Sequence, residues 1–268
     1  MMKFLLFAAV LTVGACSTGV LGNASSVAAS RQIVLGQGYE IASAALGEAR
    51  QVNVYVPPDY ATSGKSYPVL YLLHGIGGDE NEWRRGGHPE VILDNLIAAG
   101  KAKPMIIMML DGHPLGQIPR EMADRRALSL AAFKNELFQD AIPLVESHYR
   151  VSADRTQRAI AGLSMGGWQA LSIGMTNLDR FAWIGSFSGA VDENEIKPAL
   201  DDATGTNAKL KLLWIACGKD DRVLERDNQL IAKLKASSVN YEWHETPGDH
   251  SWPVWRNCLT DFVPKLFR

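Results

Sequence analysis

The sequence predicts an α/β fold, in which a mostly parallel central sheet of about eight strands is flanked by helices on both faces. Near-continuous apolar runs of strand length recur along the chain, as in strands that are covered on both faces. Helical patterns separate these runs, which is typical of parallel strands joined by crossover helices. One run leads directly into Gly162-Leu-Ser-Met-Gly166 and then a helical stretch, an order typical of a tight turn that presents a serine.

The first expected strands form an antiparallel pair at one edge of the sheet. Residues 32–46 and 51–56 alternate apolar and polar side chains, as strands with one solvated face do, and Pro57-Pro58 ends the second strand. The later strands are expected at residues 68–74, 104–110, 158–161, 181–185, 210–216 and 239–244. The helices are expected at residues 90–99, 130–149, 166–175, 222–236 and 252–267.

Two stretches do not follow this alternation. Residues 111–128 are rich in glycine, proline and charge, and residues 186–208 combine glycines with a run of acids. Each follows an expected parallel strand, and ligands of open α/β sheets bind at that edge. Long loops in compact domains tend to carry function, so we expect both stretches to shape a substrate cleft.

Length and composition fit one globular domain, expected over residues 31–268. The chain has 268 residues, 47% of them apolar, and a formal net charge of −2 from 27 basic and 29 acidic residues. Such a near balance of charge gives no electrostatic reason to expect a nucleic-acid partner. The sequence leaves the oligomeric state open.

The N-terminus predicts export. Met1-Met2-Lys3 precedes an apolar run, Phe4 to Val13, which is too short to span a bilayer and has the form of a signal peptide, expected over residues 1–15. Val13-Gly-Ala-Cys16 resembles a bacterial lipobox, which implies a lipid on Cys16, a tether over residues 16–30, and a periplasmic or outer-membrane lipoprotein. The alternative is ordinary signal cleavage, after Ala29 for example, and a secreted protein.

Two further cysteines, Cys217 and Cys258, leave two possibilities open. In an oxidising compartment they can pair as a disulfide, or they can remain two buried thiols. No cluster of cysteine and histidine has zinc-ligand spacing, so we expect no metal site, and we also expect no cofactor.

Ser164 is the expected nucleophile. A serine hydroxyl needs a base within hydrogen-bond reach, and that base needs an acid to orient it. When the serine stands on such a turn, the partners follow in the order serine, acid, histidine. Of the histidines after a suitable acid, His244 lies inside the last expected strand, whereas His250 follows the turn Pro247-Gly248-Asp249. We therefore assign His250 as the base.

The acid is expected just after the preceding strand, at Asp220 or Asp221. Adjacent side chains point in different directions, so one carboxylate serves, and we favour Asp221 because the outer position reaches back to the histidine. The backbone amides of Ile76 and Met165 are the expected oxyanion donors. His74, which precedes the serine, is expected to be structural.

Four motifs in order resemble the esterase D/feruloyl esterase group, which includes carbohydrate esterase family 1. They are Tyr71-Leu-Leu-His-Gly-Ile-Gly-Gly-Asp-Glu-Asn-Glu-Trp83, Gly162-Leu-Ser-Met-Gly-Gly167, Cys217-Gly-Lys-Asp-Asp221 and Gly248-Asp-His-Ser-Trp-Pro-Val-Trp255. The resemblance implies an α/β-hydrolase fold, a triad of Ser164, Asp221 and His250, and oxyanion donors at Ile76 and Met165. Asp249 departs from the pattern, because relatives often carry glycine there.

The resemblance implies a serine carboxylic-ester hydrolase, with feruloyl esters of plant xylan as the expected small-molecule or oligosaccharide substrate. Acetyl-xylan or other short-chain ester hydrolysis stays open, as do a siderophore-type esterase and an acyltransferase. An alternative of another class is a non-catalytic carbohydrate-binding lipoprotein.

Overall fold

The computed structural model describes residues 39–43, 46, 48–115 and 124–268. The signal peptide and tether expected over residues 1–30, the lipobox Cys16 among them, lie outside the described residues. Among the helices that are described, none is long and apolar enough to cross a membrane.

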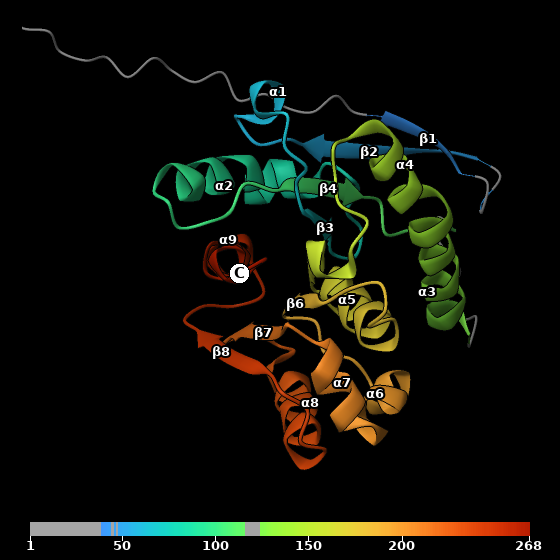
Figure 1. Ribbon diagram of the computed structural model, residues 1–268. Coiled ribbons are helices and arrows are strands. Elements are labelled where there is room, and N and C mark those ends of the chain that lie inside the picture. The colour runs from blue at the N-terminus through green and yellow to red at the C-terminus, as the bar shows by residue number, and fades with distance from the viewer. Residues whose placement is uncertain (1–38, 44–45, 47, 116–123) are drawn as a thin grey trace, which may run out of the picture. The chain divides into compact units, whose positions relative to one another are not determined.

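The central element is an eight-stranded sheet with the order β1-β2-β4-β3-β5-β6-β7-β8 (Figure 1). The first strand pair is antiparallel, β2 also runs antiparallel to β4, and the remaining neighbours are parallel. This confirms the predicted fold class and the antiparallel pair at the edge. The strands are β1 Tyr39–Ser43, β2 Glu48–Tyr55, β3 Val69–Leu73, β4 Ile106–Leu110, β5 Arg158–Leu163, β6 Trp183–Phe187, β7 Leu212–Gly218 and β8 Glu242–Thr246.

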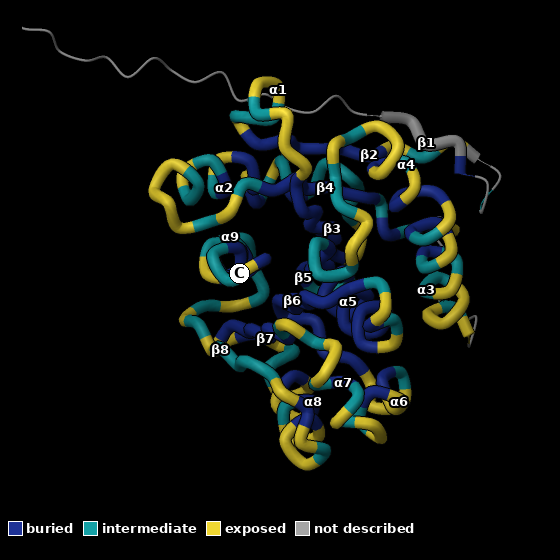
Figure 2. The backbone as a smooth tube through the Cα atoms, viewed as in Figure 1, coloured by how far each residue is buried: buried dark blue, intermediate teal, exposed yellow. Residues whose placement is uncertain are grey.

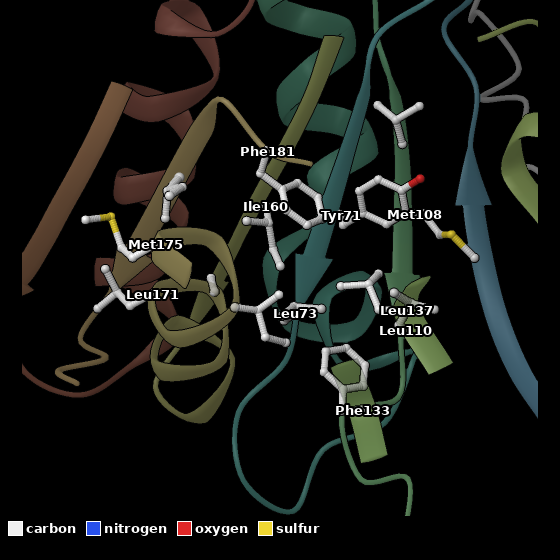
Figure 3. Packing of buried hydrophobic residues seen from close by; sticks show 14 of the residues in the cluster. Tyr71, Leu73, Met108, Leu110, Phe133, Leu137, Ile160, Leu171, Met175 and Phe181 are labelled. Atoms are coloured by element: carbon white, nitrogen blue, oxygen red, sulfur yellow. The ribbon is translucent and has the colours of Figure 1, made fainter. Parts of the chain in front are cut away.

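Alternate residues of the inner strands serve opposite faces of the sheet, because side chains on a strand alternate in direction. Tyr71 and Leu73 join one apolar cluster, with Phe133 and Leu171 from helices (Figure 3). Leu70 and Leu72 join a second cluster with residues of other helices. Both clusters are buried, which explains why the inner strands are apolar throughout and are dark in Figure 2.

Helices cover both faces of the sheet. The first cluster takes side chains from α3, α4, α5 and α8, and the second takes them from α2 and α9. Figure 1 shows α2 and α9 on one side and α3, α4 and α5 on the other. The helices are α1 Tyr60–Ser63, α2 Pro89–Ala98, α3 Arg125–Glu136, α4 Ile142–His148, α5 Met165–Thr176, α6 Lys197–Asp201, α7 Ala203–Lys209, α8 Leu224–Ala236 and α9 Trp252–Phe262.

The structure differs in detail from two expectations about these elements. The single helix expected over residues 130–149 is divided by a π-helical turn, Leu137–Ala141. Pro143 at the start of α4 lacks an amide hydrogen for the preceding turn, which favours such an interruption. The stretch 186–208 is not irregular throughout, because it holds a 3₁₀ turn, Glu193–Ile196, with α6 and most of α7.

Local capping explains these short helices. The Asp202 carboxylate accepts a hydrogen bond from the Gly205 amide at 2.9 Å, and the Asp192 carboxylate accepts one from the Asn194 amide at 2.9 Å. Aspartate in these positions satisfies amides that have no partner within the turn. The acidic residues of this stretch therefore begin helices as well as facing solvent.

Candidate active site

Ser164 occupies a strained turn between β5 and α5. Its backbone has φ 50° and ψ −113°, a conformation that costs a non-glycine residue about 1–3 kcal/mol. The flanking glycines are required by close backbone approach. A Cβ on Gly166 would lie 2.5 Å from the Leu73 carbonyl oxygen, and one on Gly162 would lie 2.5 Å from the carbonyl carbon of Gly166. The Ser164 amide donates to the Phe187 carbonyl at 2.8 Å, which ties the turn to β6.

The structure brings Ser164, His250 and Asp221 together in one hydrogen-bonded chain. His250 Nε2 lies 2.9 Å from Ser164 Oγ, and His250 Nδ1 lies 2.9 Å from each carboxylate oxygen of Asp221. The Asp221 side chain is fully buried and that of His250 is 10% exposed. A base within 3 Å of a serine, with its other nitrogen on a buried carboxylate, is the arrangement that activates a hydroxyl.

Two turns at the edge of the sheet position the acid and the base. The Lys219 amide donates to the Thr246 carbonyl at 2.8 Å, and the Asp220 amide donates to the Gly248 carbonyl at 2.9 Å. These bonds join the turn after β7 to the turn after β8. Asp220 is exposed, whereas Asp221 is buried and also accepts from the Val223 amide at 2.9 Å.

Trp255 of α9 packs beside the histidine. Its ring lies edge-to-face with the His250 ring at a centroid distance of 5.0 Å, and its Nε1–H donates to Ser188 Oγ at 3.3 Å. Trp255 is 7% exposed, so it supports the imidazole from the apolar interior. The departure from the family pattern, Asp249, bonds the Ser251 hydroxyl.

Residues Gly75–Gly78, which we call the glycine loop, lie against Ser164. A Cβ on Gly75 would lie 3.6 Å from Ser164 Cβ. Three amides of this loop have acceptors: Gly75 donates to Glu82 Oε2 at 2.9 Å, Gly77 to His113 Nε2 at 3.1 Å, and Gly78 to the Gly75 carbonyl at 3.2 Å. No described residue accepts a hydrogen bond from the Ile76 amide.

The start of α5 supplies further amides beside the serine. The first hydrogen bond of the helix runs from the Trp168 amide to the Ser164 carbonyl at 3.0 Å. The Met165 amide precedes it and has no acceptor within the helix. Ile76 and Met165, the two predicted donors, therefore lie on the two segments that flank Ser164, and the helix dipole of α5 favours negative charge at this end.

His74 is a buried structural residue, as predicted. The Gly112 amide donates to His74 Nε2 at 2.7 Å, so Nδ1 carries the proton and donates to the Gly75 carbonyl at 2.7 Å. His244 is not part of the site, because its ring stacks on Trp214 at 4.9 Å. Sequence reasoning missed His113 and Glu82 as partners of the glycine loop. For His113, the one signal in the sequence is its position just after an expected parallel strand, β4, which places it at the same edge of the sheet as the glycine loop.

The two stretches expected to shape a cleft meet beside α5. The Arg126 guanidinium lies 4.0 Å from the centre of the Trp168 ring and 3.7 Å from Glu195. Glu195 also accepts hydrogen bonds from Trp168 Nε1 at 2.7 Å and Ser172 Oγ at 2.8 Å. A groove of about 410 Å³ lies along these side chains. Residues 116–123 of the first stretch are outside the described residues.

Cys217 and Cys258 are buried free thiols, so the disulfide alternative is not found in the structure. Within the described part of the chain, no group of three or more histidine, cysteine or acidic side chains is arranged to hold a metal ion.

Comparisons with known proteins agree with this geometry. A family model described as "Putative esterase" matches residues 43–266. An endo-1,4-beta-xylanase/feruloyl esterase of Xylanibacter ruminicola is 33% identical over 236 residues, which cover 84% of this chain and 30% of that protein. An esterase of Mycobacterium tuberculosis is 37% identical over an alignment of 278 positions, gaps included, which spans 86% of this chain and 56% of that protein. The chain thus spans only part of each of these relatives.

Solved structures show the same fold. A ferulic acid esterase superposes with a TM-score of 0.74 at 27% identity, over 85% of this chain and 95% of its own. A CE1 ferulic acid esterase from Anaeromyces mucronatus, in complex with ferulic acid, also gives 0.74, at 25% identity and over 86% and 90% of the two chains. By its family match and its fold, this chain is a member of the esterase family of α/β-hydrolases.

Proposed function

We propose that this chain is a serine esterase that hydrolyses carboxylic esters, with hydroxycinnamoyl esters of plant polysaccharide such as feruloyl xylan as its substrates. The observation that carries the proposal is the hydrogen-bonded chain from Ser164 through His250 to Asp221. The proposed reaction requires no cofactor.

The reaction proceeds in two steps. As Ser164 Oγ attacks the ester carbonyl, its proton passes to His250 Nε2, and Asp221 stabilises the imidazolium through Nδ1. The same proton then goes to the leaving alcohol oxygen, which leaves an acyl group on Ser164. A water molecule gives a proton to His250 and attacks the acyl carbonyl, and that proton returns to Ser164 as the acid departs.

The Ile76 and Met165 amides stabilise the oxyanion in both steps. Each is a backbone donor beside the serine with its hydrogen available for the developing charge. Removal of one such donor lowers kcat by about 10²–10³-fold in serine hydrolases. The other amides of the glycine loop donate to Glu82, His113 and the Gly75 carbonyl. The Ile76 amide is therefore the one that the loop leaves for the oxyanion.

The substrate class rests on the relatives. A feruloyl esterase and ferulic acid esterases are among the proteins that this chain resembles. A second candidate is acetyl ester hydrolysis, because an acetyl esterase of Caldicellulosiruptor saccharolyticus is 21% identical over 72% of this chain. A panel of acetyl, feruloyl and simple aryl esters, with and without a sugar alcohol, separates the two by their kcat/KM values.

The test of catalysis compares Ser164→Ala with Ser147→Ala, an exposed serine of α4. We expect the first variant to lose ester hydrolysis with an unchanged far-ultraviolet circular dichroism spectrum, and the second to retain it. A serine-directed phosphonate should label the wild type at Ser164. Turnover retained by Ser164→Ala, or no labelling, contradicts the proposal, and absence of both activity and labelling favours the non-catalytic carbohydrate-binding alternative.

We also propose that the protein is exported and carries a lipid on Cys16. The support is the apolar run after Lys3 and the lipobox-like sequence that ends at Cys16. Cys16→Ser should move the protein from the membrane fraction to the soluble fraction. A wild-type protein that is wholly soluble after export indicates ordinary signal cleavage and a secreted enzyme.

A further inference from the structure

The glycine loop is held by a histidine that takes no part in the triad. The Gly77 amide donates to His113 Nε2 at 3.1 Å, next to Ile76. Gly77 has φ 77°, a left-handed conformation that orients its amide toward His113 and leaves the neighbouring amide free. The direction of the Ile76 amide therefore depends on an acceptor in the segment that follows β4, whereas the glycine loop itself follows β3.

The hydrogen bond defines the protonation state of His113. A backbone amide only donates, so Nε2 must present a lone pair and the imidazole must be neutral, with its proton on Nδ1. Protonation would place a hydrogen on Nε2 opposite the Gly77 hydrogen. The contact would then change from attraction to repulsion, and the loop would lose its support on this side.

The surroundings of His113 favour its neutral form, because together they lower its pKa. Burial, the nearby His74 and the Arg50 guanidinium lower the pKa of His113, and the Asp111 carboxylate opposes them. The His74 ring lies 5.4 Å away, and the Asp111 carboxylate accepts from the His113 amide at 2.8 Å. On the other side of the loop, Glu82 holds the Gly75 amide and lies 3.7 Å from His74 Nδ1.

We propose that His113 is a positioning residue for the oxyanion donor, because its neutral imidazole fixes the glycine loop through Gly77 and its protonation releases the Ile76 amide from the catalytic geometry. The inference rests on the proposed ester hydrolysis. Activity then requires two neutral histidines, His250 as the base and His113 as the acceptor. The loss of activity in acid should therefore depend on the uptake of two protons, one by each histidine.

The test uses two substitutions of the same residue on the full chain. His113→Gln keeps an acceptor oxygen at about the reach of Nε2 and cannot be protonated in this range, whereas His113→Leu removes the acceptor. We expect His113→Leu to lower kcat by about 10- to 100-fold, as small misplacements in active sites do, with little change in KM. His113→Gln should restore most of kcat, and His148→Leu, on the exposed surface of α4, should leave it unchanged.

The pH profile gives the decisive readout, because kcat/KM reports ionisations of the free enzyme. Measured from about pH 8 to about pH 4, with recovery on return to neutral pH as a control for inactivation, log(kcat/KM) of the wild type should approach an acid slope of 2. That of His113→Gln should approach a slope lower by 1, because the amide in place of the imidazole takes up no proton. Equal acid slopes in the two proteins, or a normal kcat in His113→Leu, would overturn the proposal.

The outcome is separable from that of the proposed function. If Ser164→Ala is inactive while His113→Leu has normal kcat, the esterase assignment stands and the role of His113 is wrong. If Ser164→Ala retains turnover, the proposed function fails first. If His113→Leu folds poorly, the acid slopes of log(kcat/KM) for the wild type and His113→Gln still decide whether His113 positions the glycine loop.

Discussion

The imidazole of His250 contacts the hydroxyl of Ser164 across 86 positions of the chain and across two intervening strands of the sheet. β6 and β7 separate β5 from β8, which is roughly 14 Å at the usual strand spacing. The turn after β8 covers this span by folding back over the edge of the sheet. Gly248, with φ 113°, makes that return possible, and its carbonyl accepts from the turn after β7.

The first prediction concerns the two adjacent aspartates. Asp221→Asn should lower kcat by about 10⁴-fold, as the corresponding change does in serine proteases, because an amide favours the wrong histidine tautomer. Asp220→Asn should change kcat little, since Asp220 is exposed and joins the turn through its backbone. Steady-state hydrolysis of one chromogenic ester by both variants checks the assignment, and a reversed order of effects contradicts it.

The second prediction concerns the glycine after the serine. Gly166→Ala should prevent folding or greatly reduce soluble yield, because the new Cβ would lie 2.5 Å from the Leu73 carbonyl oxygen, in backbone that cannot move away. The matched control is Gly100→Ala. Gly100 has φ 66° and open space around it, so that variant should lose only about 1–2 kcal/mol of stability. Thermal unfolding distinguishes them, and similar melting temperatures would contradict the clash.

The third prediction concerns a buried carboxyl that the proposed mechanism does not use. Asp227 of α8 is fully buried beside the Cys217 thiol, with no basic side chain bonded to it among the described residues, and burial raises its pKa to about 7. The folded protein therefore holds a proton that the unfolded chain releases above pH 3.8. The free energy of unfolding therefore falls as the pH rises from 3.8 to about 7, by at most about 4 kcal/mol.

Asp227→Asn should remove this pH dependence. The variant should differ little from the wild type near the acid end of that range and be more stable above it, because the amide never ionises. Urea unfolding at both ends measures the change, and Asp179→Asn, at an exposed position, is the matched control. If the stability difference between variant and wild type is the same at both pH values, the buried carboxyl does not titrate as described.

The fourth prediction concerns the two thiols. Burial raises the pKa of Cys258 to about 12 and raises that of Cys217 further, and only the thiolate reacts readily. In a Cys16→Ser protein, a thiol reagent should react slowly in the native state and with two thiols after denaturation. Fast native reaction would contradict the burial, and no reaction after denaturation would indicate a disulfide.

Much of the site could be predicted because its signals are local. Gly162 and Gly166 indicate that backbone segments approach closely around Ser164, and the apolar runs before them indicate strands that are covered on both faces. The order serine, acid, histidine then left few candidates. Residues 193–209 were missed because short helices depend on caps, here Asp192 and Asp202, whose acidic character also suits a solvated loop.

The sequence by itself determined the order of strands and helices, the turn at Ser164 and the set of residues from which a triad can be built, because these follow from periodicity and backbone sterics over a few positions. Only the tertiary structure decided that Asp221 rather than Asp220 reaches His250, that Cys217 and Cys258 stay unpaired, and that His113 accepts from Gly77. Those contacts join segments far apart in the chain, and their distances depend on how the sheet brings its loops to one edge.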